Sequence, residues 1–129
     1  MDKEYVMSVA KTIMEQLFWS IDKMIYFSWG VSRKVAMVYN DMPTLALRVS
    51  GVLHKGWVYI SLNEGADVYE VRLLNVSKNK VVKTIEEVYC DNLGEVIDGI
   101  VERAPGQTDD QYFKKALADS AKKMKSNAA

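Results

Sequence analysis

The start of the chain repeats apolar residues at every third or fourth position, which is the pattern of a helix with one buried face. The stripe consists of Val6, Val9, Ile13 and Leu17. Asp2 stands directly before it and belongs to the residue types that cap helix starts. We expect Phe18 and Trp19 to close the buried stripe, and the helical pattern to break at 20–22.

From residue 24 the pattern changes to a period of two, in which Ile25, Phe27 and Trp29 alternate with Met24, Tyr26 and Ser28, and this predicts strand structure. The alternation runs through 24–29, is interrupted at Gly30, and resumes over 31–39. The segment Asn40–Pro43 is a turn signal. The pattern therefore predicts one bent strand or two short strands before Pro43.

Alternation continues through further segments at 45–49, 52–62, 68–75 and 81–88. We expect Ser50–Gly51 to form a two-residue hairpin turn and Gly56 to mark a bulge. The connections are too short for parallel crossovers, so these segments predict an antiparallel meander of four to five strands. The residues expected to face the helices are Leu45, Leu47, Val58 and Ile60.

A helical period returns after Asp91, which is a candidate helix cap. Its apolar face consists of Leu93, Val96, Ile97, Ile100 and Val101. Gly94 and Gly99 lie inside this helix, where we expect them to permit close packing against the sheet. The sequence thus predicts an α+β fold: one globular domain over 1–104, with a helix packed on one face of the sheet, and an additional C-terminal helical extension over 105–129.

Length and charge narrow the class of protein. The 129 residues fit one domain, and 17 basic residues balance 17 acidic ones. Residues 1–103 carry twelve Lys and Arg against fourteen Asp and Glu, a net of −2, whereas 104–129 carry five against three, a net of +2. This balance argues against a duplex DNA binder. The single cysteine and the lack of a long apolar run favour a cytoplasmic protein that does not enter the membrane.

Catalytic motifs are scarce. Cys90 stands before the second predicted helix and His54 stands near a hairpin, but a Cys–His pair would need the two side chains in contact. Carboxylates are clustered at Asp67 and Glu70, and again at Glu86, Glu87 and Asp91. The sequence has no zinc or phosphate-binding motif, so we expect no metal and no cofactor. A small enzyme that uses Cys90 or the clustered carboxylates Asp67 and Glu70 is the least favoured of three hypotheses.

The most informative group of residues lies on the predicted sheet. Trp57 and Tyr59 project from one face of a strand, and Arg48 and Arg72 share that face on the flanking strands. We expect this face to contact a protein partner or a second copy of the chain; the last predicted helix could also cover its two rings. Aromatic rings beside guanidinium groups also suit single-stranded nucleic acid, which is the alternative hypothesis.

Three segments carry a resemblance to known sequences: SWG at Ser28–Gly30, KGWVYISLNEGADVYEV at Lys55–Val71, and VYCDNLGEVID at Val88–Asp98. With them the chain resembles a group of small uncharacterised proteins encoded in phage and mobile elements of gut bacteria. The resemblance implies an α+β architecture and an accessory role in a mobile element, and it supplies no catalytic residues. Together with the residue patterns, it predicts a non-enzymatic binding protein.

Overall fold

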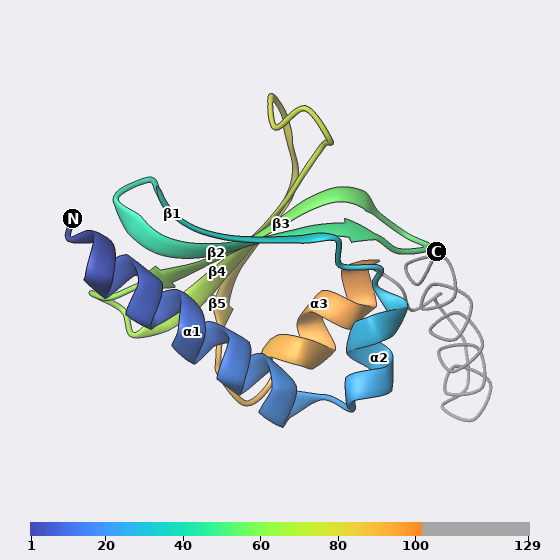
Figure 1. Cartoon of the computed structure of the whole chain (residues 1–129), viewed down its shortest axis with the longest axis horizontal. Coiled ribbons are helices and arrows are strands. Elements are labelled where there is room, and N and C mark those ends of the chain that lie inside the picture. Colours follow the sequence, from blue (N-terminus) through green and yellow to red (C-terminus); the bar gives the residue numbers. More distant parts are fainter. Residues whose placement is uncertain (102–129) are drawn as a thin grey trace.

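Five antiparallel strands form one sheet, and helices lie along one of its faces (Figure 1). The computed structural model describes residues 1–101. In chain order the elements are α1 (Lys3–Ser20), α2 (Lys23–Ser28), β1 (Arg33–Tyr39), β2 (Met42–Ser50), β3 (Lys55–Asn63), β4 (Val68–Leu74), β5 (Val81–Val88) and α3 (Leu93–Val101). This arrangement confirms the predicted α+β fold with an antiparallel meander, because each strand pairs with the next one in the chain. The predicted extension over 105–129 lies outside the described residues.

Helix α1 forms as its pattern predicts. The Asp2 side chain accepts a hydrogen bond of 3.1 Å from the backbone N–H of Glu4, which satisfies one free donor at the helix start. The residues buried along the helix are Val6, Val9, Ala10, Ile13 and Leu17. Phe18 packs partly buried against the core. The prediction for Trp19 is wrong, because its side chain lies outside the buried stripe, 91% exposed.

The expected strand at 24–29 is also wrong, since residues 24–28 belong to α2 and Trp29 is the C-cap of that helix. Asp22 caps this short helix by accepting a hydrogen bond of 2.8 Å from the N–H of Met24. Helical backbone brings Tyr26 against two aromatic neighbours, with ring centroids 4.8 Å from Phe18 and 5.5 Å from Trp29. This aromatic packing outweighs the short alternating pattern, which six residues cannot distinguish from one buried helix turn.

The turns of the sheet agree only in part with those predicted from the sequence. Asn40 and Asp41 both have positive φ angles, as a two-residue hairpin turn between β1 and β2 requires. The next turn is longer than the predicted Ser50–Gly51 pair, because Ser50 pairs with Lys55 and four residues connect them. The predicted bulge at Gly56 is wrong too, since Gly56 stays in register opposite Val49.

Gly56 is required for another reason. Its φ angle of +147° is one that side chains rarely adopt. A Cβ atom at this position would overlap the carbonyl oxygen of Leu74 and would lie 3.2 Å from the carbonyl carbon of Asn75. Glycine therefore lets β3 approach the end of β4 closely.

The main hydrophobic core fills the space between the sheet and the helices. As predicted, Leu45, Leu47, Val58 and Ile60 point into it from the two central strands. Trp29 is fully buried there, and its indole N–H donates a hydrogen bond of 2.8 Å to the carboxylate of Asp98. This bond ties the segment before the sheet to α3.

The glycines of α3 differ in what surrounds them. A Cβ on Gly94 would overlap Ile21 and would lie 2.5 Å from Ser20 Oγ, so Gly94 permits α3 to pack closely on the end of α1 rather than on the sheet. A Cβ on Gly99 would meet nothing within 4 Å. The prediction is therefore right for Gly94 only in that its packing is close, since its neighbour is α1 and not the sheet, and it is wrong for Gly99. Over the described part of the chain, no helix is long and apolar enough to cross a membrane.

Candidate functional site

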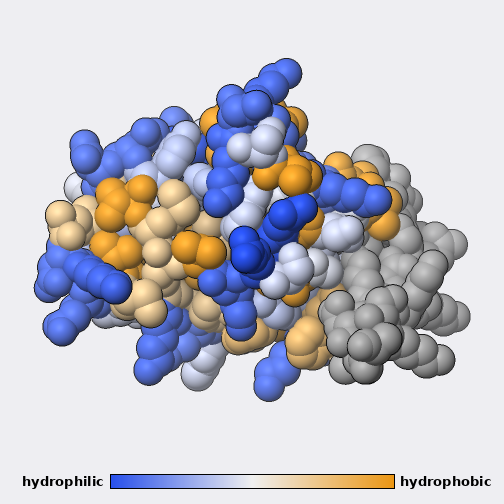
Figure 2. Space-filling model, turned by 45° about the horizontal axis from the view of Figure 1, so that its top comes forward, coloured by the Kyte–Doolittle hydropathy of each residue, from blue (hydrophilic) through white to orange (hydrophobic). Residues whose placement is uncertain are grey.

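The four residues predicted as a contact surface lie together on the face of the sheet opposite the helices, which we call the outer face. The strand register places Arg48 beside Trp57 and Tyr59 beside Arg72. The shared face was a prediction from alternation alone, and the pairing confirms it. Seen obliquely from this side, hydrophilic side chains occupy the middle of the molecule (Figure 2).

Both aromatic rings on the outer face are buried by the chain itself, Trp57 to 2% exposure and Tyr59 to 3%. The indole N–H of Trp57 donates to the carbonyl of Val76 at 3.2 Å, and Lys78 Nζ lies 4.1 Å from its ring centroid. Both contacts come from the β4–β5 hairpin, which bends over the outer face. Tyr59 packs edge-on against Tyr39, with centroids 5.2 Å apart. Trp57 and Tyr59 belong to a second small hydrophobic core, here called the outer cluster. It consists of Ala46, Trp57, Tyr59 and Leu74, with Met37 and Tyr39 packed against it.

Arg72 is also held within this layer. Its Nη2 atom donates to Glu70 at 2.5 Å, and its guanidinium carbon lies 5.3 Å from the centroid of the Tyr39 ring. Glu70 accepts a second hydrogen bond of 3.0 Å from Asn63. Arg72 Nη1 is buried, and the structure as described gives it no hydrogen-bond partner. These contacts fix Arg72 against its neighbours and leave little of it to meet a ligand.

The residues of the enzyme hypothesis come together only in part: Cys90 and Asp67 line the same hollow, whereas His54 and Glu70 lie elsewhere. Cys90 is exposed at the end of β5, whereas the His54 ring nitrogen Nε2 lies 3.3 Å from the carbonyl oxygen of Trp57. Asp67 borders a hollow beside α1, while Glu70 pairs with Arg72 on the outer face. Across residues 1–101, no group of three or more His, Cys, Asp or Glu side chains is arranged to hold a metal ion.

Trp19 is the residue that the sequence interpretation misplaced, and it is the most exposed large apolar side chain in residues 1–101. It stands two positions after Leu17, a rotation of about 200° around the helix, so its ring points away from the core. The end of α1 beneath it is held firmly. Ser20 Oγ donates to the carbonyl of Leu17 at 3.0 Å and accepts from the N–H of Gly94 at 2.9 Å.

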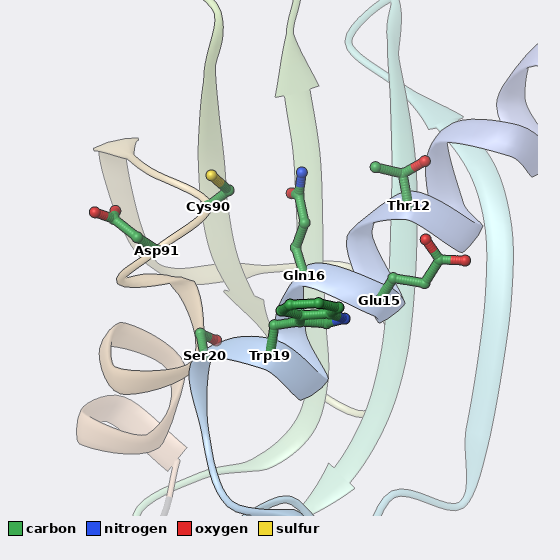
Figure 3. Close-up of a pocket in the computed structure, with 7 residues that line it drawn as sticks. All are labelled: Thr12, Glu15, Gln16, Trp19, Ser20, Cys90 and Asp91. Atoms are coloured by element: carbon green, nitrogen blue, oxygen red, sulfur yellow. The ribbon is translucent and has the colours of Figure 1, made fainter.

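Beside Trp19 lies a shallow hollow of about 480 Å³ between α1 and the connection from β5 to α3. Figure 3 shows side chains of α1 on one side and those of the connection on the other. The lining residues are Thr12, Glu15, Gln16, Trp19, Ser20, Cys90 and Asp91.

A second hollow of about 220 Å³ adjoins the first, and Gln16 and Cys90 line both. Its other lining residues are Leu62, Asp67, Val68, Tyr69, Val88 and Tyr89. We call the two hollows together the Trp19 groove.

The groove has a distinct electrostatic character. Its charged lining residues are Glu15, Asp67 and Asp91, all acidic. Burial raises the pKa of the Tyr69 hydroxyl, and the nearby Cys90 and Asp67 raise it further, whereas its hydrogen bond to Gln16 acts in the opposite direction. Tyr69 therefore remains a neutral phenol that donates to the Gln16 side-chain oxygen. The groove combines aromatic rings with negative charge.

Fluorescence quenching tests this geometry directly. Trp29 and Trp57 are buried, so among the three tryptophans a quencher dissolved in water should reach almost exclusively Trp19. Because Glu15 and Asp91 line the hollow beside the ring, caesium ions should quench it more strongly than iodide does, relative to a free tryptophan amide at low salt. Trp19→Phe should remove the quenchable emission. Equal or stronger quenching by iodide would contradict the acidic surroundings described here.

Comparison of the chain with protein-family models, with curated proteins and with solved structures gave no match.

Proposed function

We propose that this protein is a non-enzymatic binding protein, which contacts a protein partner through the Trp19 groove. The observation that carries the proposal is the exposure of Trp19, 91% of whose side chain is open to solvent on a firmly held helix end. Tryptophan is highly buried in most folded proteins, and it is among the residues that contribute most to protein interfaces. The backbone at Trp19 loses little conformational freedom on binding, because the helix that carries it is already ordered.

The groove supports this proposal better than the outer face does. A contact through Trp57 and Tyr59 would need rings that the outer cluster now covers. The same burial argues against stacking of nucleic acid bases on these rings, which requires an open ring face. At the groove, acidic residues would repel phosphate groups. An accessory role in a phage or mobile element is part of the proposal and rests on the resemblance alone.

Site-specific crosslinking tests the proposal. A photoreactive amino acid replaces Thr12, which lines the groove and is exposed, and the protein is expressed in the cells from which its gene comes. We expect one discrete crosslinked protein, and its loss when Trp19→Ala is added. The purified partner should then bind the Trp19→Ala variant at least about tenfold more weakly than the unaltered chain, as is typical of a central interface aromatic residue.

The matched control carries the photoreactive amino acid at Lys83, which is exposed on β5 and lines neither hollow. It should give no such product. If position 12 yields no discrete crosslink, or if the product survives Trp19→Ala in a variant with unchanged melting temperature, the proposed function is overturned.

A further inference from the structure

We infer that the partner presents a basic polypeptide segment to the Trp19 groove, with a lysine or arginine side chain lying against the Trp19 ring. This inference rests on the proposed function and adds the chemistry of the partner. It follows from the charge of the lining, from the aromatic rings, and from the hydrogen-bonding capacity of Gln16.

The charged side chains that line the groove all have the same sign. Across both hollows, the described lining contains acidic side chains and no lysine or arginine. The chain as a whole is balanced, with 17 basic and 17 acidic residues, so this acidity is local. A hollow of similar size between α1 and β1 has a mixed lining that includes Glu4, Lys11 and Lys34. The Trp19 groove is therefore complementary to a cation in a way that the other hollow is not.

The exposed indole of Trp19 can accept a cation against its ring. A cation over the face of a tryptophan ring is attracted by the electrons of the ring, and the attraction grows when a nearby carboxylate adds its charge. The chain already makes such a contact on the outer face, where Lys78 Nζ lies 4.1 Å from the centroid of Trp57. The ring of Trp19 is open to receive the same kind of contact from another molecule, with Glu15 beside it (Figure 3).

The two adjoining hollows suit an occupant longer than a single side chain. The second hollow repeats the chemistry of the first, since it combines Tyr69 and Tyr89 with Asp67. Gln16 lies between the two hollows, and its side-chain oxygen is engaged by Tyr69, which leaves the amide NH₂ to donate. An extended segment can offer a backbone carbonyl to that donor while it places one side chain in each hollow. A polypeptide with basic side chains fits this arrangement better than a single small cation.

Selection from a library of random displayed peptides tests the inference. Peptides are selected on the full chain and counter-selected on the Trp19→Ala variant, so that only groove-dependent peptides remain. We expect lysine and arginine to be enriched among them. A synthetic copy of a selected peptide should shift the Trp19 emission to shorter wavelength, and replacing its basic residues by glutamine should weaken binding about tenfold or more, in the range expected for a cation–π contact reinforced by carboxylates.

The protein side of the contact has its own matched pair of variants. Glu15→Gln combined with Asp91→Asn should weaken the selected peptide about tenfold, whereas Glu4→Gln combined with Glu86→Gln changes the net charge equally and should leave binding unchanged. Groove-dependent peptides without basic residues would overturn the inference and leave the proposed function standing. A single-stranded oligonucleotide that shifts the Trp19 emission would overturn it in favour of nucleic acid. Failure to select any groove-dependent peptide would overturn the inference, and the crosslinking experiment then decides the proposed function separately.

Discussion

Replacement of Trp57 and Tyr59 together by alanine is expected to unfold the protein. Each side chain is almost completely buried in the outer cluster, and a buried aromatic residue changed to alanine typically lowers the free energy of unfolding by about 3–5 kcal/mol. The pair should lose roughly 6–10 kcal/mol, which matches the whole stability of an ordinary domain. Circular dichroism during urea or thermal unfolding measures the effect.

The control for this experiment is Trp19→Ala, which makes the same kind of change at a side chain that is 91% exposed. It should alter the free energy of unfolding by less than about 0.5 kcal/mol. If the double variant instead keeps its stability and loses an interaction, the outer face is a contact surface and the assignment of these rings to a second core is wrong. The experiment therefore distinguishes between two roles for these rings: a contact surface on the outer face, or a second core that the chain itself buries.

The second large effect is expected at Gly56. Gly56→Ala places a Cβ against the backbone of Leu74 and Asn75, and it imposes a φ angle of +147° on a residue with a side chain. Backbone atoms of the neighbouring strand cannot move aside as a flexible side chain can, so we expect the free energy of unfolding to fall by about 3 kcal/mol or more. Thermal or urea unfolding again provides the measurement.

Gly99→Ala is the matched control and should have the opposite sign. A Cβ there meets nothing within 4 Å, and Gly99 lies in the exposed side of α3. Alanine in a helix interior is more favourable than glycine by about 1 kcal/mol, so this variant should be slightly more stable than the unaltered chain. Equal effects of the two substitutions would show that the close approach at Gly56 is not a constraint on the fold.

The fold was predictable where the hydrophobic pattern is long enough to indicate which side of a helix or strand is buried. The apolar stripe of α1 and the alternation of the central strands each extend over many residues, and both are confirmed. The segment 24–29 is too short for its period to decide between helix and strand. There the outcome depends on the cap at Asp22 and on the contacts of Tyr26 with residues elsewhere in the fold, which a local pattern does not contain.

The candidate site was harder to predict, for two physical reasons. Alternation correctly places Trp57 and Tyr59 on the outer face, but it carries no information about the β4–β5 hairpin that covers Trp57. For Trp19 the necessary signal was present, because its rotation from Leu17 already directs it away from the core. The Trp19 groove itself depends on side chains from α1, β4 and the connection before α3, and their meeting is a product of the tertiary fold.

The hydrogen bond between Gly94 and Ser20 joins residues 74 positions apart in the sequence. The groove can therefore form only late in the synthesis of the chain. One wall of the groove is made as soon as α1 folds, but the other arrives only with Cys90 and Asp91 near the end of the described chain. During synthesis on the ribosome, a growing chain therefore exposes Trp19 long before it can close the groove around a ligand. In the proposed function, the partner therefore meets a complete groove only after synthesis has passed Asp91.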